Sequence, residues 1–284
     1  MDTRPSPIAG RWYPGDSRQL ASSVDGYVGA AELPEINGEV IAVVAPHAGH
    51  VYSGPVAGYA FGAVQGMQFE LVAVVSPMHQ PYSQPLLTSA HQAYQTPLGS
   101  IVIDLDAVAE LDQQLQAELG FGLTQVRNDA EHSLEIELPF LQRVIEGEFR
   151  LLPVMVRDQS TQVAEVLGKT LAKILSGKTA LIVASTDLSH FYNQDQAVKL
   201  DQEMLRQLEA FDPLGVLKAE EEGKGFACGR YAVAAALWAA KELGANEVKI
   251  LKHATSGEVT GDYTGVVGYA AAVITRRTSE VSLN

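Results

Sequence analysis

Residues 40–47 read VIAVVAPH, an apolar, β-branched run that ends in a proline and a histidine. Residues 71–79 (LVAVVSPMH) and 180–190 (ALIVASTDLSH) repeat the arrangement. The histidines past the three runs are His47, His79 and His190. Continuous apolar runs are typical of strands covered on both faces, and ligands of open α/β sheets bind beyond the carboxyl ends of the strands. The three stretches therefore predict an α/β fold with a metal or acid/base site.

The rest of the chain alternates predicted strands and helices. Strands are expected at 40–45, 71–75, 100–104, 149–156, 179–185, 247–253 and 265–275, and helices at 55–65, 105–118, 133–146, 160–176, 195–210 and 229–243. This order predicts a three-layer α/β sandwich with a mixed central sheet. Pro139 is expected to kink or split the third helix. Because no linker, repeat or charge block divides the chain, residues 1–284 are expected to form a single domain.

The composition limits the class of partner. A net charge of −14 argues against nucleic acid and anionic membranes, because binding phosphates requires clustered Lys and Arg. The N-terminal residues MDTRPSPIAGRWYPGD lack the basic and apolar regions of a secretion signal, and no apolar run approaches the length of a spanning helix. We therefore expect a soluble, cytoplasmic protein whose partner is a small molecule or a peptide.

Cys228 is the single cysteine, so no internal disulfide is expected. It comes just before the apolar stretch 231–240, which is predicted to be a core helix. A thiol at a helix N-terminus faces the positive end of the helix dipole, which favours the thiolate, the form that binds metal. The alternative interpretation is a small hydrophobic residue that fills a gap in the core.

Other polar residues near the predicted strand ends have two interpretations each. Asp187 can orient a ring or bind metal while His190 moves protons, or the two can simply hydrogen-bond to each other. His132, beside Glu131, is either a fourth inward imidazole or a polar residue in the first turn of a helix. Asn128 with Glu131 fits a capping pair for that helix. The two histidines without such context are interpreted as structural: His91 and His253.

Six motifs, in order along nearly the whole chain, resemble the MEMO family. They are AGRWYP (9–14), PHAG (46–49), PMH (77–79), EHSLE (131–135), STDLSH (185–190) and ACGR (227–230). The family is called system protein B where it occurs beside an AMMECR-type protein and a radical-SAM protein, so the resemblance implies these two as partners. It is similar in fold to the class III, non-haem-iron extradiol dioxygenases. The resemblance implies a metal site of His47, His79 and Cys228, with Asp187 and His190 alongside.

The sequence departs from the family pattern at two places. His50 stands where the family usually has tyrosine, and Ser76 and Met78 replace the commoner glycine and Ser/Asn around His79. Neither departure removes an implied ligand. Both bear on the shape and polarity of the pocket wall.

Two imidazoles and one thiolate accept Zn(II), Fe(II) or copper and leave a coordination position open, which is typical of a catalytic site. Our preferred hypothesis is a metal-dependent redox protein that holds Fe(II) or copper through His47, His79 and Cys228. His190 and Asp187 then act in acid/base or supporting roles, and His132 is a lesser candidate for proton transfer.

Three rival hypotheses stay open. The first is metal-free nucleophilic catalysis by Cys228 with a histidine base, and the second is zinc-assisted hydrolysis. The third is a non-enzymatic module that binds a peptide or a small ligand in a dioxygenase-like pocket. The apolar residues Tyr52, Met78 and Phe191 suit either an aromatic substrate or a peptide side chain.

Overall fold

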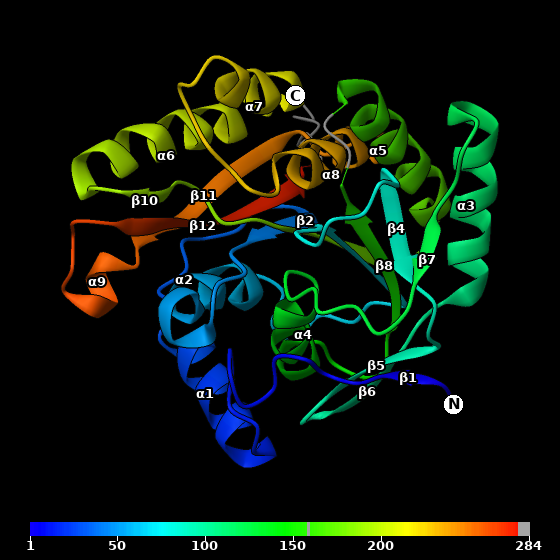
Figure 1. The fold of residues 1–284 in the computed structure, drawn as a ribbon, viewed down its shortest axis with the longest axis horizontal. Coiled ribbons are helices and arrows are strands. Elements are labelled where there is room, and N and C mark those ends of the chain that lie inside the picture. Colours follow the sequence, from blue (N-terminus) through cyan, green and yellow to red (C-terminus); the bar gives the residue numbers. More distant parts are fainter. Residues whose placement is uncertain (158–159, 278–284) are drawn as a thin grey trace, which may run out of the picture.

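A computed structural model describes residues 1–157 and 160–277 (Figure 1). Residues 158–159 and 278–284 of the predicted domain lie outside the described residues. The main strands are β2 (Glu39–Ala45), β3 (Leu71–Pro77), β4 (Leu86–Ser89), β7 (Thr124–Val126), β8 (Arg150–Val156), β9 (Ala180–Ser185), β10 (His190–Tyr192), β11 (Glu247–Thr255) and β12 (Val266–Arg276). Within the described part they form a nine-stranded sheet of order β10-β12-β2-β9-β3-β8-β4-β7, with β11 paired to β12.

Four parallel strands form the middle of this sheet. They are neighbours in the order β2, β9, β3 and β8. These strands are the apolar runs of the sequence, and every residue after the first in each of them is buried. β12 joins β2 in antiparallel orientation, and β4 joins β8 in the same way. The predicted mixed central sheet is therefore confirmed.

Helices cover both faces of the sheet (Figure 1). Below it in that view lie α1 (Ser17–Gly29), α2 (His50–Gly62) and α4 (Leu138–Val144). Above it lie α5 (Thr161–Leu175), α6 (Gln194–Glu209), α7 (Pro213–Glu221) and α8 (Arg230–Glu242), and α3 (Leu105–Leu119) packs beside α5. The short α9 (Gly257–Thr260) lies beyond the sheet, next to β11. The predicted three-layer α/β sandwich is confirmed.

Helix α8 lies directly on the parallel strands. It contacts β9, β3 and β2 on one side and α5 on the other. All ten residues from Tyr231 to Ala240 are buried, because small alanines allow close approach on both sides. The start of α8 is thereby fixed against the carboxyl ends of the central strands.

A small second sheet holds the N-terminal segment. It consists of β1 (Thr3–Arg4), β5 (Ala93–Thr96) and β6 (Gly99–Val102), with β1 parallel to β5. The strand that the sequence predicts at 100–104 is β6, so it belongs to this sheet and not to the central one. The Arg4 side chain projects into the protein and is 1% exposed.

Two predicted helices differ from the structure in detail. α2 begins at His50 and contains Pro55, where the sequence predicts a start at residue 55. The predicted helix 133–146 is split into a 3-10 turn at Glu135–Glu137 and α4, and Pro139 lies in the first turn of α4, where its missing N–H is tolerated. The predicted split is confirmed. The predicted capping pair of Asn128 and Glu131 is wrong, because residues 127–132 form a loop.

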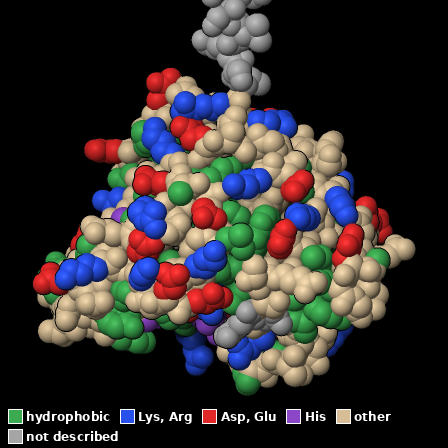
Figure 2. All heavy atoms as spheres, turned by 90° about the horizontal axis from the view of Figure 1, so that it is seen from above, with side chains coloured by type: hydrophobic (Ala, Val, Ile, Leu, Met, Phe, Trp, Pro, Cys, Tyr) green, Lys and Arg blue, Asp and Glu red, His purple; other side chains and the backbone are tan. Residues whose placement is uncertain are grey.

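The surface carries mixed charge where it can be seen in Figure 2. Basic and acidic side chains are interspersed over that face. In the described part of the chain, no helix combines the length and the apolar character needed to cross a membrane.

Candidate metal centre

His47 follows β2 and is 2% exposed. Its Nδ1 lies 2.9 Å from the Oγ of Ser185, which ends the neighbouring strand β9. That hydroxyl also lies 2.7 Å from the carbonyl oxygen of Ser133 and 2.6 Å from Oε1 of the buried Glu137. These contacts fix the imidazole ring and engage Nδ1, so Nε2 is the nitrogen that remains for a ligand.

A single carboxylate, that of Glu131, holds two further histidines. Its Oε1 lies 2.9 Å from Nδ1 of His79 and 3.3 Å from Nδ1 of His132. It also accepts backbone N–H bonds from His79, His132 and Ser133. Burial alone would raise the pKa of Glu131, but the hydrogen bond and charge of His79 lower it below its ordinary value. Glu131 therefore stays ionised and orients both rings.

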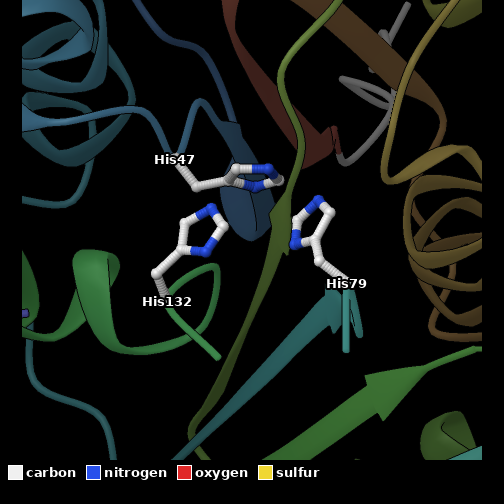
Figure 3. Close-up of side chains that lie close together, drawn as sticks. All are labelled: His47, His79 and His132. Carbon is white, nitrogen blue, oxygen red and sulfur yellow. The ribbon is translucent and has the colours of Figure 1, made fainter. Parts of the chain in front are cut away.

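The three imidazoles converge from separate segments (Figure 3). His47, His79 and His132 each offer one ligand atom, and these atoms all lie within 4.8 Å of one another. The rings of His79 and His132 are stacked with centroids 4.8 Å apart, and the His47 ring stands edge-on to both. Imidazole nitrogens are suitable ligands for transition-metal ions such as zinc, copper and iron.

Cys228 lies at the edge of this cluster. Its Sγ is 3.1 Å from Nε2 of His47 and accepts a 3.3 Å hydrogen bond from the backbone N–H of Asp187. Gly229 is required next to it, because a Cβ there would lie 2.4 Å from the carbonyl oxygen of Ser185. The thiol is therefore held against His47 by the close packing of α8 on β9.

Burial controls the protonation of these groups. It lowers the pKa of His47 well below its ordinary value, helped by the neighbouring His132 and His79, and it lowers the pKa of His132 to about 4. Both rings are therefore neutral near pH 7, as metal binding requires. Burial, reinforced by the Asp187 carboxylate, raises the pKa of the Cys228 thiol. The predicted thiolate is wrong for the metal-free chain, because desolvation outweighs the helix dipole.

Asp187 and His190 take different positions. The buried Asp187 carboxylate accepts the backbone N–H of His47 at 2.7 Å, so it supports the loop and does not orient a ring. Burial raises the pKa of Asp187 to about 7. His190 bonds through Nδ1 to the carbonyl oxygen of Leu188 at 2.7 Å, and its ring packs on Phe226. Among the described residues, no hydrogen bond joins Asp187 to His190.

The remaining histidines lie outside the cluster. His91 pairs with Asp2 at 3.0 Å, and His253 pairs with the buried Asp201 at 2.8 Å. His50 is buried, bonds to the carbonyl oxygen of Ile136 at 3.0 Å and packs against Phe140. His50, which stands where the family usually has tyrosine, therefore affects the packing against Phe140. Met78, the departure next to His79, lines a cavity beside that histidine.

The sequence does not reveal the full roles of two supporting residues. Ser185 lies within the STDLSH motif without a signal for its contact with His47, and the position of Glu131 indicates a helix cap. A carboxylate directly before His132 is a sequence signal for an orienting partner. That the same carboxylate also reaches His79, 52 residues earlier, depends on the fold alone.

Replacing Glu131 by glutamine is expected to weaken metal binding roughly 10- to 100-fold, the range for loss of a partner that orients a ligand. The uncharged amide cannot accept from two imidazoles and three backbone amides as the carboxylate does. Competition with a chelator measures the affinity. Glu118→Gln, at an exposed ion pair with Lys173, is the matched control. Equal affinities for both variants would contradict the role assigned to Glu131.

The fold and this site together define a three-layer α/β protein with a candidate metal centre built on histidines. The chain belongs to the Memo-like protein family, whose model matches residues 4–273.

Relatives of this family match over nearly the full chain. A MEMO1 family protein of Methanopyrus kandleri is 35% identical over 97% of this chain and 100% of its own length. One of Nitrosopumilus maritimus is 31% identical over 93% of this chain and 96% of its own. A crystal structure of an uncharacterized Escherichia coli K12 protein, JW3007, covers 83% of this chain and 100% of its own at a TM-score of 0.46 and 10% identity.

Proposed function

We propose that this protein is a metal-dependent redox protein that binds Fe(II) or copper at His47 and His79. The observation that carries the proposal is the convergence of three imidazoles with ligand atoms within 4.8 Å of one another. Nδ1 of His47 is engaged by Ser185 and Nδ1 of His79 by Glu131, so each ring presents Nε2. Fixed, neutral imidazoles of this kind are suitable transition-metal ligands.

The donor atoms fit a metal ion if they move slightly closer together. Two nitrogens that bind one ion at about 2.1 Å lie at most about 4.2 Å apart. The cluster spacing of up to 4.8 Å is slightly wider than this. Two residues can supply the third donor. They are His132, which belongs to the cluster, and Cys228, whose Sγ contacts His47. We propose Cys228 as the third ligand, because metal binding releases the proton that burial otherwise keeps on the sulfur.

A bound Fe(II) or copper ion would supply one-electron chemistry and an open position for a small molecule or a peptide group. The chain supplies the surrounding proton donors and acceptors. His190 has its Nδ1 engaged by Leu188 and keeps Nε2 for proton transfer. Asp187, with a pKa of about 7, holds the His47 backbone in place. The chemistry of the ligand set, rather than the fold, supports the redox assignment.

Metal analysis tests the proposal. Protein purified under reducing, anaerobic conditions is expected to carry or take up about one iron or copper ion per chain, because the site has one set of donors. Elemental analysis after removal of excess metal gives the stoichiometry. Correctly folded protein that takes up neither ion contradicts the proposal. Exclusive uptake of zinc favours hydrolysis instead.

The contact between Cys228 and His47 favours a second candidate, a metal-free nucleophile with a histidine base. In that reaction Sγ attacks an electrophile, and the thiol proton passes to Nε2 of His47 over 3.1 Å. The raised pKa of Cys228 disfavours it. Metal loading distinguishes the two, because a bound ion suppresses alkylation of Cys228, whereas the rate at a free nucleophile does not respond to metal.

A further inference from the structure

A cavity lies beside the candidate metal centre, between the carboxyl ends of β3 and β8 and the first turn of α8. His79 and Cys228 form one wall, so it opens onto the same groups as the centre. Its volume is about 180 Å³. Pockets that enclose a whole small-molecule ligand usually measure 300–1,000 Å³. The cavity therefore suits one end of a ligand whose other part reaches the histidines.

Arg230, the last residue of the ACGR motif, lines this cavity at the start of α8. Its Nη1 forms an ion pair with Glu220 at 2.5 Å, and its guanidinium carbon lies 4.7 Å from the centre of the Tyr231 ring. Its buried Nε has no hydrogen-bond partner among the described residues. A guanidinium carries five N–H donors, so the ion pair with Glu220 leaves donors for an anion.

The surroundings of Arg230 add positive charge. Arg157, at the end of β8, lines the same cavity, and within the described ranges its guanidinium forms no hydrogen bond or ion pair. The N-terminus of α8 carries no side-chain cap, so its partial positive charge also faces this region. Among residues 1–157 and 160–277, the one carboxylate paired with these arginines is Glu220, which does not line the cavity. In a chain of net charge −14, this cavity has two guanidinium groups and a helix N-terminus on its wall.

We propose that this cavity is an anion subsite that binds the terminal oxyanion, a carboxylate or phosphate group, of the substrate. Arg157 and Arg230 hold the oxygens, and the adjoining part of the molecule lies at His79 and Cys228. That the bound anion belongs to a substrate rests on the proposed redox function, but anion binding itself needs no metal. It can therefore be tested on the metal-free chain, so that its failure is separate from failure of metal binding.

Cys228 offers a direct probe, because it is the single cysteine and lines the cavity. Iodoacetate and iodoacetamide alkylate a thiol by the same step, in which the S–C bond forms, the C–I bond breaks, iodide leaves and the thiol proton passes to solvent. Only iodoacetate is an anion. The ratio of the two rates, divided by the ratio for free glutathione, cancels the reactivity of the thiol itself. We expect this normalised ratio to be about 10, which corresponds to the free energy of one charge-assisted hydrogen bond.

Arg230→Gln and Arg157→Gln are each expected to bring the ratio towards one. The matched control is Arg143→Gln, which removes an arginine from an exposed ion pair with Asp25 on α1 and is expected to keep the wild-type ratio. A wild-type ratio of one or below contradicts the proposal. So does an elevated ratio that survives both cavity variants.

A second measurement does not depend on the thiol. Titration calorimetry of metal-free protein with benzoate, with neutral benzamide and with inorganic phosphate compares the ligands at equilibrium. We expect benzoate or phosphate to bind at least about 10-fold more tightly than benzamide, and Arg157→Gln to remove the difference. Preference for benzoate identifies a carboxylate, and preference for phosphate identifies a phosphoryl group. Equal binding of the anions and benzamide, or absence of anion binding, overturns the proposal.

Discussion

Alanine in place of His47 is expected to reduce metal affinity by at least about 100-fold while leaving the fold intact. Structural metal sites with four ligands supply roughly 10–16 kcal/mol, so one ligand accounts for several kcal/mol. His47 offers one ligand nitrogen to the cluster and contacts Ser185 and Cys228 through its two nitrogens. The same loss is expected for His79→Ala. Chelator competition measures the affinity, and thermal unfolding of the metal-free proteins checks the fold.

Two further alanine variants decide the third ligand. If Cys228 binds the ion, Cys228→Ala loses as much affinity as His47→Ala, and His132→Ala loses less. The reverse order identifies a centre of three histidines, as their spacing permits. Full metal affinity in His47→Ala would contradict both arrangements. His253→Ala is the control, because that ring pairs with Asp201 away from the cluster.

Replacing Arg4 by methionine is expected to lower the free energy of unfolding by about 3–5 kcal/mol, the usual cost of removing one partner from a buried ion pair. The Arg4 guanidinium contacts Asp129 at 2.7 Å, Glu135 at 2.5 Å and the carbonyl oxygen of Glu131 at 2.8 Å. Without it, two carboxylates lose their counter-charge in a dry environment. Urea denaturation of the metal-free protein measures the loss.

The control for this prediction is Arg143→Met, whose ion pair with Asp25 is half exposed and is expected to contribute about 0–1 kcal/mol. Equal destabilisation by the two variants would contradict the buried role of Arg4. Because Arg4 holds the loop that carries Glu131 and His132, its replacement is also expected to weaken metal binding.

The central strands could be predicted because their apolar runs are continuous and buried. Helix α1 was missed although Leu20, Val24 and Val28 are buried on one face at a spacing of four residues. Such a signal was available in the sequence. The short strands β4, β5, β7 and β10 carry no comparable signal, since three or four residues are fixed by their neighbours in the sheet.

The candidate site was predictable in its residue types and less so in its contacts. Histidines after strand ends and the ACGR motif are visible in the sequence. The bond from Ser185 to His47 and the double use of Glu131 arise only when separate segments pack together. The protonation of Cys228 was mistaken because the helix dipole can be inferred from sequence, whereas the degree of burial cannot.

The wide separation of these side chains along the sequence determines when the proposed metal site can form. His47 and Cys228 touch although 181 residues separate them. Closing so long a loop costs chain entropy, which only the packed fold repays. An ion cannot nucleate the fold here as it does in a zinc finger, where the ligands are close in sequence. The proposed donor set with Cys228 is complete in a nascent chain only after α8 has left the ribosome and docked on the sheet.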